Sequence, residues 1–334
     1  MRLPRLLRLK IDGYELRVRT EWPRAGGRHA RVVAAGPPMV LLHGVGSSHR
    51  YLIPLQYELA SASVVHSFDL PGFGGTAKPT RPLSIAEYGR LIGRALDRLA
   101  ELESRDAPRS IDVPDARHKR ASPVGEGVTP VEPSGAACAV VVAHSMGTQF
   151  AVELARHRPE LVSGLVLMGP VSDPRRASLA RSGFELLRDT LAEPVQVKRV
   201  QGGDFLRCGL AWFVAESRVM LAYPLLERMA GLGCPVLVLR GKHDPIARAD
   251  WCGRVAASAR ADSARSASAV VEVEGQRHVV HLTAPGRVAG AIRAFVADLL
   301  PGETLPESDE ADGRDGRDWR DEHDQQDEHD ERAT

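Results

Sequence analysis

Ser145 stands in a local pattern that is typical of a nucleophilic serine. An apolar run, CAVVV, precedes the segment AHSMG at 143–147, and TQFAVELARHRPE, which has a helical period, follows it. This order predicts a strand, a sharp turn and a helix, with the Ser145 hydroxyl exposed at the turn and open to a base. Small residues two positions on either side let the strand and the helix approach closely. One of them is Gly147, and the other is Ala143 in place of a second glycine.

A glycine-containing turn lies upstream of this serine. The apolar run MVLL leads into the segment HGVG at 43–46. Backbone N–H groups in such a turn are suited to bind a developing oxyanion. We expect the N–H of Val45 to be one donor, and the N–H of Met146, at the start of the helix after the serine, to be the second. His43 and His144, beside these donors, are candidates for lining a substrate pocket.

The serine needs a base and an acid that orients the base, and two aspartates follow apolar runs downstream. Asp244 comes after PVLVLRG, in the segment GKHDP. This places it in a loop beyond the C-terminal end of a predicted strand, where α/β sheets carry functional groups. Asp173 follows GLVLMGP and is the competing candidate. We assign the orienting role to Asp244 and interpret Asp173, which precedes a proline, as a turn residue.

Two histidines follow the last apolar run. His278 and His281 lie in the segment QRHVVH, directly after AVVEVEG, and so in a loop that leaves a predicted strand. Histidine is the most frequent general base because its ordinary pKa lies near neutral pH. The residues alone leave both histidines open as the base.

The elements that must position these residues follow from the hydrophobic pattern. Residues 6–20 alternate apolar and polar on both sides of Asp12-Gly13, which predicts a β-hairpin. Further along, short apolar runs near 39, 63, 139, 164, 235 and 269 alternate with segments of helical period. Runs that are apolar on both faces predict parallel strands covered by helices, and therefore an α/β sheet.

The sequence resembles the α/β-hydrolase family over about residues 6–300, apart from an insert and a variable cap. The resemblance rests on HGVG at 43, DLPGFGGT at 69, AHSMG at 143, GKHD at 241 and GQRHVVHLTAP at 275, in the family order of nucleophile, acid and base. It implies a mostly parallel eight-stranded sheet flanked by helices. It also implies a glycine three residues before the catalytic histidine and a proline seven residues after it. Gly275 and Pro285 satisfy this spacing for His278, so His281 is expected to line the pocket or to be structural.

The resemblance also implies a helical cap after the sixth strand. We expect this cap at 171–233, with residues 1–170 and 234–300 forming the core. Trp212 and Phe213 in the cap are candidates for an apolar substrate pocket. The alternative, that these aromatic residues form the cap's own core, stays open for most of them. The cap's aromatic residues are Phe184, Phe205, Trp212, Phe213 and Tyr223. We expect Asp69 and the three glycines of DLPGFGGT to be structural.

Two segments do not fit the layered pattern. Residues 104–136 contain five prolines and no aromatic residue, a composition that predicts a disordered insert. Residues 301–334 are rich in Asp, Glu, Arg and Gly and repeat DEHD, which predicts a disordered acidic tail. The histidines of that repeat suit loose binding of a divalent metal, but a solvated tail is the favoured interpretation.

Charge and composition restrict the partners. The chain carries a formal charge of +1, but 301–334 hold 14 acidic and 4 basic side chains, so the remaining residues carry +11. This charge is spread over single arginines, so we expect no nucleic-acid binding. No apolar run reaches the ~18 residues of a membrane span, and the first residues do not resemble a signal peptide, so we expect a cytoplasmic protein. The four cysteines lack CxxC spacing, and we expect no metal and no organic cofactor.

The expected function is that of a serine hydrolase. Ser145, His278 and Asp244 are expected to cleave an ester or lactone of a small, largely apolar substrate through an acyl-enzyme. The resemblance also implies that epoxide hydrolases and dehalogenases of this fold use a carboxylate nucleophile, and a serine at 145 disfavours both activities. Two alternatives remain: a carbon–carbon bond hydrolase that acts on a diketone-like ring-cleavage product, and a non-catalytic ligand receptor or scaffold on the same fold. The sequence does not indicate the oligomeric state.

Overall fold

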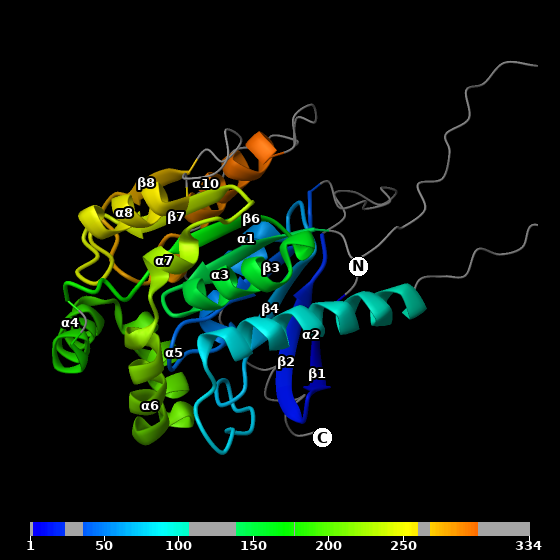
Figure 1. Ribbon diagram of the computed structural model, residues 1–334, viewed down its shortest axis with the longest axis horizontal. Helices are drawn as coiled ribbons and strands as arrows, with labels where there is room; N and C mark the ends of the chain where they lie inside the picture. Colours follow the sequence, from blue (N-terminus) through cyan, green and yellow to red (C-terminus); the bar gives the residue numbers. More distant parts are fainter. Residues whose placement is uncertain (1–2, 24–35, 107–137, 177, 260–267, 300–334) are drawn as a thin grey trace, which may run out of the picture. The chain divides into compact units, whose positions relative to one another are not determined.

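A computed structural model of the chain describes residues 3–23, 36–106, 138–176, 178–259 and 268–299 (Figure 1). The predicted insert lies outside the described residues from 107 onward, and the predicted acidic tail lies outside them entirely. No helix in the described ranges is both long and apolar enough to cross a membrane.

The strands form one mixed sheet in the order β1-β2-β4-β3-β5-β6-β7-β8. The pairs β1–β2 and β2–β4 are antiparallel, and the other neighbours are parallel. The predicted eight-stranded, mostly parallel sheet is therefore confirmed. The strands are β1 (Arg5–Ile11), β2 (Tyr14–Glu21), β3 (Met39–Leu42), β4 (Val65–Asp69), β5 (Ala139–His144), β6 (Val162–Met168), β7 (Val236–Gly241) and β8 (Ala269–Val273).

The apolar runs became strands where both faces of the sheet are covered. Every residue of β3, β5 and β7 is buried. The predicted hairpin is β1–β2, and its turn places Asp12 and Gly13 at φ 52° and 84°. These positive angles match the right-handed twist of the two strands, which is why an Asp-Gly pair suits this turn.

Helices cover both faces of the sheet (Figure 1). On one face α1 contacts α9 and α10, and on the other α2 contacts α3, while α7 contacts α3 and α8. The 3₁₀ helices are η1 (His49–Leu52) and η2 (Pro159–Leu161). The α-helices are α1 (Ile53–Leu59), α2 (Ile85–Asp106), α3 (Gly147–His157), α4 (Leu179–Ala192), α5 (Val195–Cys208), α6 (Leu210–Ala222), α7 (Leu225–Met229), α8 (Ala249–Ala259), α9 (Val280–Thr283) and α10 (Pro285–Leu299).

Helix α2 corrects one predicted boundary. Its start is fixed by a reciprocal pair, in which Ser84 N–H donates to Glu87 Oε2 and Glu87 N–H donates to Ser84 Oγ. The helix then continues to Asp106, so residues 104–106 are helical and do not belong to the predicted insert. Leu99 is buried and Leu102 packs against the core, and this apolar face extends the helix past the expected boundary.

Helices α4 to α7 lie between β6 and β7, within the segment 171–233 for which a cap was predicted. The loops after β3, β5, β7 and β8, which carry the candidate residues, leave the C-terminal ends of parallel strands and so meet at one edge of the sheet.

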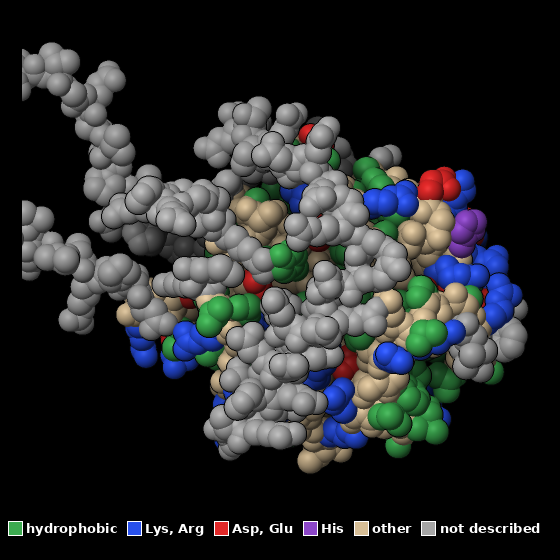
Figure 2. All heavy atoms as spheres, turned by 180° about the vertical axis from the view of Figure 1, so that it is seen from behind, with side chains coloured by type: hydrophobic (Ala, Val, Ile, Leu, Met, Phe, Trp, Pro, Cys, Tyr) green, Lys and Arg blue, Asp and Glu red, His purple; other side chains and the backbone are tan. Residues whose placement is uncertain are grey.

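Figure 2 shows the molecule from behind, where Lys and Arg side chains lie at several separate places among hydrophobic side chains.

Candidate active site

The backbone at Ser145 is held in a strained conformation. Its φ is +55°, in the left-handed region that non-glycine residues rarely adopt. The turn joins the end of β5 to the start of α3, and Ser145 N–H donates to Met168 O over 2.9 Å. A Cβ at Gly147 would lie 2.6 Å from Leu42 O and 2.7 Å from His43 O, so glycine is required for the helix to pass this close to β3.

The turn after β3 faces the serine. A Cβ on Gly44 would lie 2.9 Å from Ser145 Cβ, which shows how closely the two turns approach. Within the described ranges, no hydrogen-bond acceptor is found for the backbone N–H of Val45 or of Met146. Neither predicted donor is therefore engaged by another group in these ranges; Val45 lines the same cavity as Ser145, whereas Met146 is buried and is not among the lining residues.

Asp244 and His278 form a buried pair. Asp244 Oδ2 lies 2.8 Å from His278 Nδ1, and Asp244 Oδ1 accepts from the N–H groups of Ile246 (2.8 Å) and Ala247 (2.9 Å). Burial alone would raise the pKa of Asp244, but the charge and hydrogen bonds around it lower this pKa below its usual value. For His278, burial opposes the charged form, but the carboxylate of Asp244 outweighs it and raises the pKa.

The competing aspartate lies elsewhere. Asp173 is paired with Arg254 over 2.6 Å and accepts from the N–H of Arg175 over 3.1 Å. The second contact closes a local turn of the kind expected for an Asp-Pro sequence. The hydrogen bond of His278 Nδ1 goes to Asp244 instead.

A cavity of about 270 Å³ contains both Ser145 and His278 in its wall. Among the residues that the sequence analysis named, Val45, His144 and Phe213 also line it. Most of the other lining side chains are apolar. They include Val171, Leu179, Leu186, Leu210, Val214, Met220, Leu221 and Ile246, with Ser47, Ser172, Gln201 and Ser217 as polar members.

His43 and Trp212, which were expected in the pocket, are not part of its wall, and neither is His281, which was expected either in the pocket or in a structural role. His43 is fully buried behind the turn, where its Nε2 accepts from Leu70 N–H over 3.2 Å. Trp212 packs on Gly72, where a Cβ would lie 2.4 Å from the indole Nε1. His281 is buried next to the rings of Tyr51 and His144, at centroid distances of 4.5 and 4.3 Å. Their aromatic rings fill the core around the site instead of the cavity.

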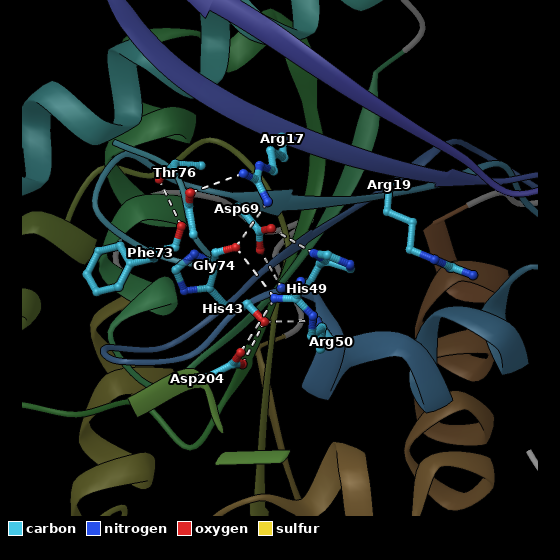
Figure 3. Close-up of polar contacts among 12 residues, drawn as sticks. Arg17, Arg19, His43, His49, Arg50, Asp69, Phe73, Gly74, Thr76 and Asp204 are labelled. Atoms are coloured by element: carbon cyan, nitrogen blue, oxygen red, sulfur yellow. Dashed lines mark hydrogen bonds and ion pairs between the residues drawn. The ribbon is translucent and has the colours of Figure 1, made fainter. Parts of the chain in front are cut away.

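Asp69 is hydrogen-bonded to the segment that follows the turn after β3, in agreement with its expected structural role (Figure 3). Asp69 accepts from the N–H of His49 over 2.6 Å and from its Nδ1 over 2.7 Å. Burial would raise the pKa of Asp69, but the charge and hydrogen bonds of His49 lower it to about 2. On the other side, Ser48 Oγ donates to Asp204 Oδ2 of α5 over 2.6 Å. The segment after the Val45 turn is thus tied both to the sheet and to the helices above it.

The sequence analysis missed Tyr51, Asp189 and Glu193. Tyr51 OH contacts both the Gly44 turn and His144. Asp189 and Glu193 are buried acids from the end of α4 and the loop after it, and both raise the pKa of His278. Burial in turn raises the pKa of Glu193 to about 7. No spacing in the sequence links these residues to the site, because the links arise from packing between distant segments.

Two relatives of known function that resemble this chain are named as hydrolases of small molecules or esters. A pimeloyl-acyl-carrier-protein methyl ester esterase of Xanthomonas campestris pv. campestris is 27% identical over 273 residues, which cover 81% of this chain and 99% of the relative. An (E)-2-((N-methylformamido)methylene)succinate hydrolase of Acinetobacter baylyi is 23% identical over 288 residues, covering 78% and 90%.

Solved structures show the same fold. A thermophilic esterase from Thermogutta terrifontis matches with a TM-score of 0.63 at 17% identity, covering 88% of this chain and 99% of that one. An enol-lactonase from Burkholderia xenovorans matches with a TM-score of 0.58 at 18% identity, covering 87% and 100%. The family model described as the alpha/beta hydrolase family matches residues 39–291. The chain therefore belongs to the alpha/beta hydrolase family.

Proposed function

We propose that the protein is a serine hydrolase that cleaves a carboxylic ester or lactone of a small, largely apolar substrate. The observation that carries the proposal is that Ser145, on a strained turn, lines the same cavity as His278, whose Nδ1 is hydrogen-bonded to Asp244. This arrangement of hydroxyl, imidazole and carboxylate is the one that activates serine for acyl transfer.

The proposed reaction has two halves. In the first, Ser145 Oγ attacks the carbonyl carbon, His278 Nε2 takes the hydroxyl proton, and the N–H groups of Val45 and Met146 bind the oxyanion. The protonated imidazole then gives this proton to the departing alkoxide, which leaves an ester on Ser145. In the second half, water attacks the acyl-enzyme with His278 again as base, and the acid is released. Asp244 stabilises the imidazolium in both halves.

The cavity supports a limit on substrate size. Its volume of about 270 Å³ lies at the small end of the range for ligand pockets, which favours a small substrate. Because most of the lining side chains are aliphatic or aromatic, burial of an apolar acyl group supplies most of the binding free energy. We propose unbranched acyl groups of about four to eight carbons as the preferred substrates.

Two measurements test the proposal: labelling by a fluorophosphonate probe, and, on separate untreated enzyme, turnover of a panel of p-nitrophenyl esters. We expect the probe to label the protein and kcat/KM to be highest for the four- to eight-carbon esters. Labelling without turnover of any ester or simple lactone would favour the carbon–carbon hydrolase. Absence of labelling would favour the non-catalytic receptor.

A further inference from the structure

A chain of hydrogen bonds connects the oxyanion turn to the loop of the base. Gly44 N–H donates to Tyr51 OH over 2.6 Å, Tyr51 OH lies 2.9 Å from His144 Nδ1, and His144 Nε2 lies 3.0 Å from the carbonyl oxygen of His278. The four residues come from the turn after β3, from η1, from the end of β5 and from the loop after β8. Gly44 and Tyr51 lie seven residues apart, whereas His144 and His278 are distant in the sequence, and the four meet beside Ser145.

The two backbone groups at the ends of this hydrogen-bond series fix which atom donates in each of its bonds. A backbone N–H can only donate, so the oxygen of Tyr51 accepts from Gly44, and its single proton goes to His144 Nδ1. His144 must then carry its own proton on Nε2, which donates to the carbonyl of His278, a group that can only accept. Burial, reinforced by the positive charges that His281 and His278 can carry, holds the pKa of His144 well below its usual value. His144 is therefore neutral at neutral pH, as this series of hydrogen bonds requires.

We propose that Tyr51 and His144 are positioning residues, which hold the base loop and the oxyanion turn at a fixed separation across Ser145. This proposal rests on the proposed serine-hydrolase function. His278 lies in a loop outside regular secondary structure, and its side chain is held by Asp244. His144 supplies the second anchor, on the backbone of the same residue. Tyr51 links His144 to Gly44 through its hydroxyl, and Val45, the neighbour of Gly44, carries the proposed oxyanion donor.

If Tyr51 and His144 served only to stabilise the fold, their hydrogen-bond partners could lie on any neighbouring segment. Here both outer partners are backbone groups of the two segments that the reaction must align, and each distance is 3.0 Å or less. Transition-state stabilisation is sensitive to small displacements of base and oxyanion donors. We therefore expect that loss of these hydrogen bonds lowers kcat more than it weakens substrate binding.

Tyr51→Phe removes the hydroxyl and keeps the ring against His144 and His281. We expect kcat for a p-nitrophenyl ester to fall about tenfold or more, with KM changed less than about twofold, because the lost contacts act on the transition state. Tyr88→Phe is the matched control. Tyr88 OH is also buried and hydrogen-bonded, to Pro71 O and Glu216 Oε1, but Tyr88 does not line the cavity. This variant should lose stability and keep kcat.

Two amide variants of His144 distinguish its hydrogen bond to Tyr51 from its hydrogen bond to the carbonyl of His278. In His144→Gln, the amide nitrogen reaches the position of Nε2 and can still donate to the carbonyl of His278. In His144→Asn, the shorter amide occupies the position of Nδ1 and loses that contact. We expect the glutamine variant to keep more of kcat than the asparagine variant. We also expect the acid limb of the kcat/KM profile to move to lower pH in His144→Asn, because a looser loop weakens the Asp244 contact that raises the pKa of His278.

The outcomes are distinct from those that test the proposed function. Folded Tyr51→Phe with kcat within about twofold of the parent enzyme would overturn the proposal, and so would equal losses in Tyr51→Phe and Tyr88→Phe. A slower rate of fluorophosphonate labelling in Tyr51→Phe, in proportion to its kcat, would support it. Failure of the parent enzyme to react with the probe would instead remove the serine-hydrolase function itself.

Discussion

At the scale of single residues, the carboxylate of Asp244 both orients His278 and stabilises its charged form. Both of its oxygens are engaged, one by His278 and the other by the backbone N–H groups of Ile246 and Ala247. These fixed contacts leave the carboxylate one orientation. A neutral amide at this position would present an N–H toward the imidazole and favour the wrong tautomer.

The variant Asp244→Asn is therefore expected to lose at least about 10³-fold in kcat/KM. Asp173→Asn should change kcat/KM by less than about threefold, because it weakens a contact with Arg254 that lies partly at the surface. Steady-state kinetics with one p-nitrophenyl ester measure both. The reverse ranking would assign the orienting role to Asp173.

The pH dependence should follow the charge on His278. The imidazole must be neutral to accept a proton from Ser145, and Asp244 raises its pKa above 6.5 in the folded protein. As the pH falls, the base is therefore protonated earlier than a free histidine would be. We expect the acid limb of kcat/KM to have its midpoint above 6.5. A profile that stays flat from about pH 5 to 8 would exclude a histidine base.

The sequence predicted the residues with recognisable neighbours and missed those defined by contacts. Ser145, Asp244 and His278 each follow an apolar run in a recognisable motif, and the structure brings Asp244 and His278 into contact and places Ser145 on the same cavity. Tyr51 has no such motif around it: one of its partners, Gly44, is only seven residues away, but the other, His144, is 93 residues away. Hydrogen bonds between distant segments leave no spacing that a single sequence can reveal.

At the scale of elements, strands were the most predictable part of the fold. The buried runs of β3, β5 and β7 are apolar on both faces, and this pattern is visible directly in the sequence. The end of α2 was less predictable because its apolar face runs on into a segment of mixed composition. His43 and Trp212 show a further limit, since an aromatic side chain beside the site can face either the cavity or the core.

The junction of β5 and α3 gives an element-scale prediction. Gly147→Ala places a methyl group less than 3 Å from two backbone carbonyl oxygens, so we expect a loss of about 1–3 kcal/mol in the free energy of unfolding. Gly290→Ala in α10 is the control, because a Cβ there meets nothing within 4 Å. This substitution should raise stability by up to about 1 kcal/mol. Thermal unfolding compares the two, and an unchanged Tm for Gly147→Ala would contradict the close approach.

At the scale of the whole molecule, charge is divided unevenly along the chain. Residues 307–334 hold 13 acidic and 4 basic side chains, so their removal changes the formal charge from +1 to +10. We expect the truncated protein to bind a cation exchanger at neutral pH more tightly than the full chain. Its Tm and its kcat/KM on a small ester should be nearly unchanged, because a segment with so few apolar side chains offers little apolar surface for burial. A large fall in Tm would show that the segment contributes to the fold.

The cavity is the feature of the whole molecule that the sequence specified least. Its wall combines the turns after β3 and β5 with side chains from α4, α5 and α6. The volume depends on how these helices pack over the sheet, and their periodicity does not determine that packing. An apolar pocket was expected from the aromatic residues of the cap; of those whose side chains the structure describes, only Phe213 is among the lining residues, and the size of the pocket required the structure.

Labelling by a serine-directed organophosphorus reagent, mapped by peptide mass spectrometry, tests the central claim most directly. We expect one adduct per chain, located on Ser145. Ser145→Ala should fold, take up no reagent and lose at least about 10³-fold in kcat/KM, since the hydroxyl and the base act as a unit. An adduct on another residue, or a Ser145→Ala enzyme with unchanged activity, would contradict the account.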